Sequence, residues 1–277
     1  MISPASDPVL SDSRDCRQHR VALVTGATGA IGKAIASRIA SHPELEVVLV
    51  CRDAAKAAAA ARDIRERTGN EKVRFEIADL GRRASVEALA TRWNGPVSVL
   101  VNNAAITPRR REVTPEGIER QFATNVLGYF WMISAFRDLL SRSAPARVVN
   151  VASYWAGGLD LEDLEFERRG YDNDAAYRQS KQADRMLTAA FAERLGGEGV
   201  SVNACHPGDV LSNLSRSLGF GGHESPDQGA DTPAWLATDD VGGNSTGRYF
   251  EHRREVACRF AADREGVEAL YRACERR

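Results

Sequence analysis

Tyr177 and Lys181 are four residues apart, in the segment Tyr-Arg-Gln-Ser-Lys. Residues with this spacing share one face of a helix, so a phenol and an ammonium can point into the same crevice. A tyrosine hydroxyl alone has a pKa of about 10, and a cation within about 4 to 6 Å lowers that pKa by roughly 1 to 3. The spacing therefore predicts a general acid/base pair in which Tyr177 exchanges the proton.

Two further polar residues precede this pair in the chain. Ser153 follows a β-branched run that is typical of a buried strand, and its hydroxyl can polarise a substrate carbonyl. Asn125 lies within residues 116–140, whose pattern predicts a long helix, although asparagine is a mediocre helix former. Taken singly, Ser153 fits a strand-end cap and Asn125 a local kink. Together with Tyr177 and Lys181, in this order, they predict a catalytic set.

A glycine-rich turn follows the first apolar run of the chain. Residues 25–32 read Thr-Gly-Ala-Thr-Gly-Ala-Ile-Gly and lie between a predicted strand and a predicted helix. Glycines let the backbone turn tightly and approach a pyrophosphate, and the free amides at a helix N-terminus favour its negative charge. The turn predicts a dinucleotide site, while a plain turn between strand and helix is the alternative.

Arg52 follows the second predicted strand, where a carboxylate would hydrogen-bond the ribose 2′-hydroxyl of NAD. Cys51 cannot act as that acid, whereas a guanidinium suits the 2′-phosphate of NADP through charge-assisted hydrogen bonds. Arg52 therefore favours NADP over NAD. The alternative is a solvated arginine in front of a helix that Asp53 caps.

The elements that must position these residues alternate along the chain. Short β-branched runs predict buried parallel strands, and the longer amphipathic stretches between them predict helices, which is the rhythm of βαβ units. Right-handed crossovers then give an α/β fold with a single doubly wound (Rossmann) parallel sheet, helices on both faces, and a ligand crevice at the carboxyl ends of the strands. We expect strands at residues 21–25, 46–51, 73–77, 97–101, 148–151 and 200–205, and helices at 31–39, 53–67, 86–93, 116–140 and 175–195.

Composition narrows the class of protein. The chain has 277 residues, 43% hydrophobic and 27% charged, with a formal net charge of -1. These values are typical of a globular domain and give no field that would attract nucleic acid or acidic lipid. No apolar run approaches the roughly 20 residues that span a bilayer, and the N-terminal segment has no signal-peptide core. We therefore expect a cytoplasmic enzyme without nucleic-acid or membrane partners.

The rest of the chain predicts one domain and no metal. The five cysteines and five histidines show no ligand spacing, so free buried thiols are expected. Residues 1–19 predict a flexible polar tail and residues 20–277 a single domain. Within that domain, residues 211–228 are rich in Ser and Gly and predict a mobile lid, and residues 157–174 predict a surface flap.

In their order along the chain, these motifs resemble the short-chain dehydrogenase/reductase family and, within it, the retinol dehydrogenase branch. The resemblance covers residues 20–272. The spacing from Ser153 to Tyr177 is similar to that of the retinol dehydrogenase branch. Besides the residues above, three motifs that follow predicted strands carry the resemblance: Asp79-Leu80, Asn102-Asn103-Ala104-Ala105 and His206-Pro207-Gly208.

The resemblance implies a role for each residue of the catalytic set. Tyr177 would transfer the proton, and Lys181 would hold the nicotinamide ribose and lower the Tyr177 pKa. Ser153 would hold the carbonyl oxygen, and Asn125 would anchor a water of the proton relay. The implied activity is that of an NADP(H)-dependent oxidoreductase that interconverts a carbonyl and a secondary or primary alcohol of a small molecule.

The same resemblance implies the contacts to NADP (NADPH). Asp79 would contact the adenine, the Asn102 segment would support the adenosine side, and residues 207–212 would wrap the nicotinamide. The implied cofactor-binding residues are Gly26, Thr28, Gly29, Ala30, Ile31, Gly32, Arg52, Asp79, Leu80, Asn102, Ala104, Tyr177, Lys181, Pro207, Gly208, Val210 and Ser212.

Other interpretations stay open at this point. Ala30 stands where the family's usual turn has a glycine, and the glycine spacing is similar to the extended branch, which includes sugar epimerases and nucleotide-sensing proteins. The alternatives are therefore a non-catalytic NADP-sensing protein and an epimerase or dehydratase with transient hydride transfer. Asp209 either selects a polar or cationic substrate group or is an exposed loop acid. Members of the family often pair through helices, so a homodimer is possible.

Overall fold

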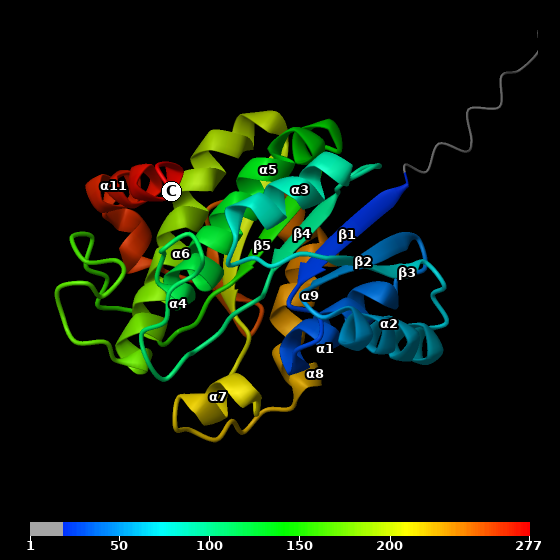
Figure 1. Cartoon of the computed structure of the whole chain (residues 1–277). Coiled ribbons are helices and arrows are strands. Elements are labelled where there is room, and N and C mark those ends of the chain that lie inside the picture. The colour runs from blue at the N-terminus through cyan, green and yellow to red at the C-terminus, as the bar shows by residue number, and fades with distance from the viewer. Residues whose placement is uncertain (1–18) are drawn as a thin grey trace, which may run out of the picture.

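A single sheet of eight strands runs through the middle of the molecule, in the order β3-β2-β1-β4-β5-β6-β7-β8 (Figure 1). The computed structural model describes residues 19–277, so the expected tail and Cys16 lie outside the described residues, apart from His19. Strands β1 to β7 are parallel, and β8 pairs antiparallel with β7. The expected α/β fold with one parallel-dominated sheet is confirmed.

Each strand predicted from a β-branched run is present. The fourth is shifted, because β4 begins at Val99 and ends at Asn102 rather than covering residues 97–101. The last two strands carry too short an apolar run to be recognised in the sequence. The strands are β1 Arg20–Thr25, β2 Leu45–Cys51, β3 Val73–Ile77, β4 Val99–Asn102, β5 Ala146–Val151, β6 Val200–His206, β7 Tyr249–Glu251 and β8 Arg254–Val256.

Helices cover both faces of the sheet, and successive residues of a strand serve opposite faces. In β1, Ala22 and Val24 pack with α1, α2 and α9, whereas Val21 and Leu23 pack with α3, α5 and α6. The helices are α1 Ala30–Ala40, α2 Ala54–Thr68, α3 Arg83–Arg92, α4 Arg120–Phe122, α5 Gly128–Arg142, α6 Asn173–Leu195, α7 Asn213–Ser217, α8 Pro226–Gly229, α9 Asp231–Thr238, α10 Asp240–Asn244 and α11 Arg264–Glu275, with 3-10 turns at Gly196–Glu198 and Arg259–Ala262.

The helix expected over residues 116–140 is wrong in two respects, because it begins only at Arg120 and is not one continuous α-helix. A five-residue π-helix, η1 (Ala123–Leu127), separates the short α4 from α5, and Asn125 lies at its centre. The amide of Asn125 is engaged outside the helix, where its Oδ1 accepts from the Ile106 N–H at 2.9 Å. The local irregularity expected at Asn125 is thus present as a π-helix. Such insertions in an α-helix often occur at functional sites, and the functional role of Asn125 stays a prediction.

Two loop expectations also change. Residues 157–174 are no loose flap, because Leu164 and Phe166 are buried and Asp163 accepts hydrogen bonds from the backbone N–H groups of the residues that follow. The segment 211–228 is partly helical, since α7 and α8 each begin with a serine capping box. No helix within residues 19–277 is long and apolar enough to cross a bilayer.

Candidate active site

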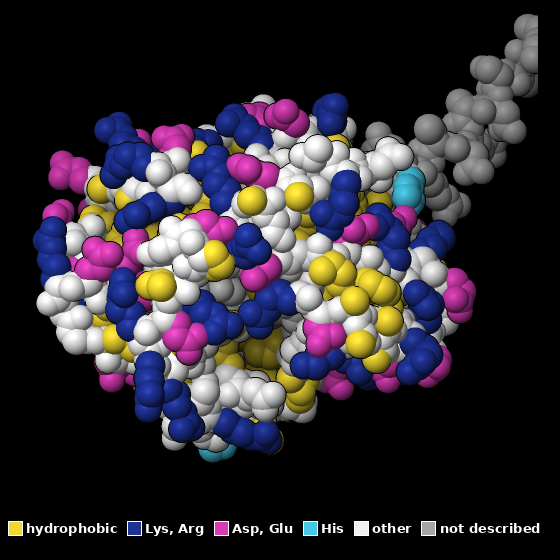
Figure 2. All heavy atoms as spheres, viewed as in Figure 1, with side chains coloured by type: hydrophobic (Ala, Val, Ile, Leu, Met, Phe, Trp, Pro, Cys, Tyr) yellow, Lys and Arg dark blue, Asp and Glu magenta, His cyan; other side chains and the backbone are white. Residues whose placement is uncertain are grey.

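A cavity of about 640 Å³ opens at the carboxyl ends of the strands around β1, between the glycine turn and α7. In Figure 2 a hollow with an apolar floor lies just above α7. The cavity is lined by ten of the residues expected to bind a cofactor, Gly26, Thr28, Gly29, Ala30, Ile31, Gly32, Arg52, Leu80, Ala104 and Ser212. The structure therefore brings together most of the glycine turn, the tip of β2 and the segments after β3 and β4.

Close backbone approach explains the glycines of the turn. Gly26 has φ 65°, and a Cβ atom there would lie 2.7 Å from the Ala104 Cα. A Cβ atom on Gly32 would lie 2.5 Å from the Asn103 Nδ2. Ala30, by contrast, is simply the first residue of α1, so its methyl group is accommodated without disturbing the turn.

The N-terminus of α1 is left without a side-chain cap, because its N-cap residue is Gly29. Uncapped first-turn N–H groups and the helix dipole form an anion site. The next helix is different, since Asp53 caps α2 and accepts from the Lys56 N–H at 3.0 Å. The capping expected for Asp53 is confirmed, and its carboxylate is engaged at the helix start.

Three cationic side chains line this cavity. Arg52 and Lys56 come from the end of β2 and the start of α2, and Arg216 comes from α7. Asp53 is the only acid among the lining residues. The sequence pattern indicated Arg52 but neither Lys56 nor Arg216. Nothing in the sequence shows that a basic residue on an exposed helix face lines the same cavity once the chain has folded.

Ser153 and Tyr177 meet at the end of β5. Both side chains are buried, and the Ser153 hydroxyl lies close enough to Tyr177 to affect its pKa. The Ser153 Oγ accepts from the Trp155 N–H at 3.0 Å, which fixes its orientation. Burial raises the pKa of Tyr177, and the neighbouring Ser153 side chain opposes that rise. At neutral pH the phenol is therefore protonated.

Lys181 lies one helical turn beyond Tyr177, as the spacing predicts, but its ammonium is directed elsewhere. Its Nζ donates to the Val151 carbonyl at 2.9 Å and to Asp184 Oδ2 at 2.8 Å. The Nζ is 5.9 Å from the centroid of the Tyr177 ring. Burial is the largest cause of the raised Tyr177 pKa, and the Lys181 ammonium is paired with Asp184. The expected effect of Lys181 on the Tyr177 pKa stays a prediction.

Asn125 connects the segment after β4 to α6. Its Nδ2 donates to the Ile106 carbonyl at 3.1 Å and to the Ser180 Oγ at 3.3 Å. Ser180 in turn donates to the Tyr177 carbonyl at 2.7 Å. Asn125 is fully buried, so its amide holds the backbone near Tyr177 in place.

A model of the short chain dehydrogenase family matches residues 20–219. The chain belongs to this family. Retinol dehydrogenase 13 of Mus musculus is 37% identical over 268 residues, covering 90% of this chain and 80% of that protein. Retinol dehydrogenase 12 of Mus musculus is 34% identical over 272 residues, covering 92% of this chain and 85% of that protein. The expected resemblance to the retinol dehydrogenase branch is confirmed.

Solved structures agree with this assignment to the short chain dehydrogenases. The complex of Pseudomonas aeruginosa RhlG with NADP has a TM-score of 0.67 and 27% identity, covering 84% of this chain and 94% of that one. Actinorhodin polyketide ketoreductase with NADPH has a TM-score of 0.65 and 25% identity, covering 84% and 95%.

The other residues that the short chain dehydrogenase resemblance implies lie around the cavity or beneath it. Asp79 accepts from the Gly81 N–H at 3.0 Å and shapes the turn after β3. Asn102 is fully buried and donates to Asn150 Oδ1 at 3.0 Å, so its side chain lies inside the sheet rather than in the cavity. The neighbouring Asn103 instead supports the glycine turn, donating to the Thr25 carbonyl at 3.0 Å.

Residues 207–212 pass over the end of β6 towards α7. Gly208 has φ 99° and packs against the Glu224 carboxylate, and Val210 is buried. Ser212 caps α7. This segment therefore joins the catalytic end of the sheet to the helix that closes the cavity.

Aromatic side chains flank the space in front of Ser153. Trp155 contacts Phe220 edge-on, with ring centroids 5.1 Å apart. Tyr154 packs edge-on against the buried His206, and its hydroxyl is 3.5 Å from Asp209 Oδ2. Asp209 therefore lies near the catalytic set, and it forms no ion pair among the described residues.

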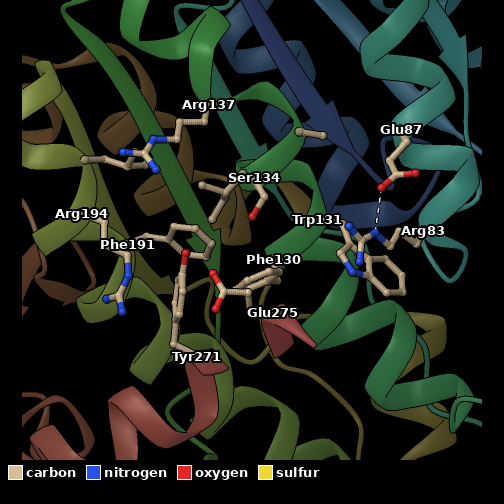
Figure 3. A pocket seen from close by; sticks show the side chains of 13 residues that line it. Arg83, Glu87, Phe130, Trp131, Ser134, Arg137, Phe191, Arg194, Tyr271 and Glu275 are labelled. Carbon is tan, nitrogen blue, oxygen red and sulfur yellow. Dashed lines mark hydrogen bonds and ion pairs between the residues drawn. The ribbon is translucent and has the colours of Figure 1, made fainter. Parts of the chain in front are cut away.

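A second hollow, of about 380 Å³, lies on the other side of the molecule between α3, α5, α6 and α11. Figure 3 shows Phe130, Phe191 and Tyr271 clustered at its centre, with arginines around them. Each arginine that lines it is paired with a carboxylate: Arg83 with Glu87, Arg137 with Glu198, and Arg194 with Glu268. None of the catalytic set lines either hollow, but ten of the residues expected to bind a cofactor line the first and none lines the second. The candidate active site is therefore the crevice at the strand ends.

Proposed function

We propose that the protein is an NADP(H)-dependent oxidoreductase that interconverts a carbonyl and an alcohol of a small molecule, with Tyr177 as general acid/base. The observation that supports this best is the pair of buried side chains Ser153 and Tyr177, near each other at the strand ends and close to a cavity with a glycine turn. Membership of the short chain dehydrogenase family supports the oxidoreductase class.

The cavity fits a dinucleotide. Its backbone approaches most closely where Gly26 and Gly32 have no side chain, and the first turn of α1 offers uncapped N–H groups to a pyrophosphate. When bound, NADPH supplies the hydride that the reduction of a carbonyl requires. The protein's contribution is to bind, orient and protonate.

The charges at the adenosine end favour NADP over NAD. Arg52, Lys56 and Arg216 line the cavity, and charge-assisted hydrogen bonds to a 2′-phosphate are stronger than neutral ones. Lys56 also pairs with Asp53 at 3.8 Å, an exposed contact that a phosphate can replace. The nearby carboxylate of Asp53 is engaged as the cap of α2, so it is a poor partner for the free 2′-hydroxyl of NAD. The titles of two structural neighbours name NADP or NADPH.

Ser153 and Tyr177 have different roles at the carbonyl oxygen of the substrate. In this proposal the Ser153 hydroxyl donates a hydrogen bond that polarises the carbonyl. Tyr177 donates its proton to the same oxygen as negative charge develops there. In this proposal the edge-on pair Trp155 and Phe220 serves as an apolar wall for the substrate.

The experiment is a panel of ketones, aldehydes and alcohols incubated with the full-length protein and NADPH or NADP, followed by nucleotide absorbance. We expect stoichiometric consumption of NADPH with at least one carbonyl. Tight NADPH binding without turnover of any compound would instead indicate a nucleotide sensor. Product formation with no net change in NADPH would indicate an epimerase or dehydratase. Either result overturns the proposed reaction.

A further inference from the structure

Asp184 follows Lys181 by three residues on α6, on the same face of the helix. Both side chains are withdrawn from solvent, with exposures of 0% for Asp184 and 2% for Lys181, and the Nζ to Oδ2 distance is 2.8 Å. The pair lies directly behind the candidate active site, because Lys181 also binds the carbonyl of Val151, two residues before Ser153. Neither the sequence motif nor the proposed reaction gives Asp184 a role.

Two of the three N–H donors of the Lys181 ammonium are engaged in this arrangement. Asp184 and the Val151 carbonyl accept them, and the Nζ lies 5.1 Å from the centroid of the Tyr129 ring. The side chain is buried on these partners. A lysine that holds a nicotinamide ribose must therefore turn away from at least one of them to reach the sugar.

Asp184 is the partner that can be released by a change of charge. Its Oδ1 is buried and has no hydrogen-bond partner, so the carboxylate is held by Lys181 through Oδ2 alone. The other titratable groups that face it are uncharged: Tyr129 on α5, Cys274 on α11 and Tyr177 on α6, whose pKa values are all raised by burial. No second cation in the described core compensates its charge.

We propose that Asp184 is a positioning residue that holds the Lys181 ammonium in the core, in competition with the nicotinamide ribose, and so sets how much positive charge reaches Tyr177. This inference rests on the proposed function, because it concerns the lysine of the same site. With Asp184 ionised, the ammonium is neutralised within the core. With Asp184 neutral, Lys181 is free to bind the ribose and to favour the tyrosinate.

The competition between Asp184 and the ribose for Lys181 should depend on pH. Burial raises the pKa of Asp184 to about 6, against the opposing effect of Lys181. Protonation of the carboxyl therefore begins as the pH falls towards 6, and the hold on Lys181 weakens there. Cofactor affinity should increase over this interval. NADH is the better probe for this measurement, because it has no 2′-phosphate that would titrate in the same range.

The test compares Asp184→Asn with the wild type as full-length proteins. Asparagine keeps an oxygen acceptor for Lys181 and removes the charge. We expect the variant to bind NADH about tenfold more tightly at pH 7.5, the gain of one charge-assisted hydrogen bond, and to lose the change in affinity near pH 6. The alkaline limb of the kcat profile for carbonyl reduction should move down by about 1 pH unit, because the charge of Lys181 then acts fully on Tyr177.

Glu193→Gln is the matched control, since it removes a carboxylate from the surface of the same helix, where Glu193 pairs with Arg264. It should behave as the wild type in both measurements. If Asp184→Asn does not fold, the affinity of the wild type for NADH, measured as a function of pH, still tests the proposal. An affinity that does not change between pH 7.5 and 5.5 overturns it. A purely structural role for Asp184 would change the melting temperature and leave both the affinity and the pH limb unchanged.

These outcomes separate the two proposals. Turnover with NADPH that is identical in the wild type and Asp184→Asn overturns the role of Asp184 and leaves the proposed function standing. Nucleotide binding that responds to Asp184→Asn, with no turnover on the panel, supports the positioning role and overturns the reaction. Absence of any nucleotide binding overturns both.

Discussion

Gly26 and Ala104 approach each other so closely that a Cβ atom on Gly26 would lie 2.7 Å from the Ala104 Cα. The two residues come from turns after neighbouring strands, β1 and β4. Their contact sets the depth of the cavity at the point where a pyrophosphate would lie. A side chain at this position must move the backbone of one turn or the other.

Gly26→Ala should therefore lower both the stability of the fold and the affinity for the cofactor. Its φ of 65° strains any residue with a side chain by about 1 to 2 kcal/mol, and the clash with Ala104 adds about 1 to 3 kcal/mol. Gly69→Ala is a matched control, because Gly69 has φ 70° with nothing within 4 Å of an added Cβ. Thermal unfolding and NADPH titration should show a larger loss of stability in Gly26→Ala, and a loss of affinity in that variant alone. Equal effects of the two substitutions would mean that close approach at Gly26 is irrelevant.

Tyr177→Phe removes only the phenol oxygen. We expect turnover to fall by about 10² to 10⁴, the usual contribution of general acid/base catalysis, while the dissociation constant for NADPH changes little. Tyr271→Phe is the control, because it removes the same oxygen from a half-buried tyrosine on α11, at the second hollow and away from the catalytic set. Initial rates and fluorescence titration of both variants provide the comparison. Undiminished turnover in Tyr177→Phe would contradict the proton-transfer role.

Arg52→Asp replaces a cation at the cavity with the acid that NAD-binding sites of this kind use. The ratio of kcat/KM for NADPH to that for NADH should fall by about tenfold or more, since a hydrogen bond to a charged group is worth about 1.5 to 3 kcal/mol. Arg62→Asp is the control, because it makes the same charge change on the exposed part of α2. An unchanged ratio in Arg52→Asp would show that the 2′-phosphate is held by other residues, and Arg216→Ala would then be the next variant.

The sequence predicted what depends on neighbours in the chain. The spacing of Tyr177 and Lys181, the turn at Gly26 and the strand before Ser153 are local patterns, and the structure brings them to one end of the sheet. The partner of Lys181 was missed because an acid three residues along a helix is usually exposed. Asp184 is buried only because α5 and α11 pack over this part of α6.

The π-helix was not predicted, and residues 157–174 were predicted only as a surface flap, for a similar reason. The side chain at the centre of the π turn, Asn125, exchanges two hydrogen bonds with the backbone of Ile106, a residue 19 positions away that no periodicity reveals. The segment 157–174 has neither helical nor strand period, yet it is ordered by the Asp163 carboxylate and by the burial of Phe166. Tertiary contacts determine these features, and local secondary-structure propensity does not reveal them.

The pH dependence of the two reaction directions should be opposite in sign. Burial raises the pKa of Tyr177, so the protonated acid persists through neutral and mildly alkaline pH. Carbonyl reduction uses this acid form and should stay flat from pH 6.5 to 8.5. Alcohol oxidation needs the tyrosinate, so its kcat should rise with pH over the same range. Rates in both directions with one ketone and alcohol pair test this prediction. A reduction rate that already falls as the pH is raised from 6.5 to 8.5 would mean that the Tyr177 pKa is lower in the complex.

Asp163→Asn should destabilise the protein at neutral pH and much less in acid. Although burial raises the pKa of Asp163, hydrogen bonds from the N–H groups of Glu167, Arg168 and Arg169 and the charge of Arg169 outweigh it and leave the pKa below its ordinary value. The contribution of an ionised carboxylate with a lowered pKa is present above the ordinary value of 3.8 and is lost as the pH falls through the folded-state value. We expect a loss of about 1 to 3 kcal/mol at pH 7.

Asp138→Asn is the matched control, because Asp138 is an exposed carboxylate on α5 that makes no hydrogen bond within the described structure. Denaturant unfolding of both variants and the wild type at pH 7 and below pH 4 gives the measurement. The deficit of Asp163→Asn should shrink towards zero on acidification, whereas Asp138→Asn should match the wild type throughout. A deficit that stays constant with pH would assign the effect to packing of the segment 157–174 rather than to the charge that orders it.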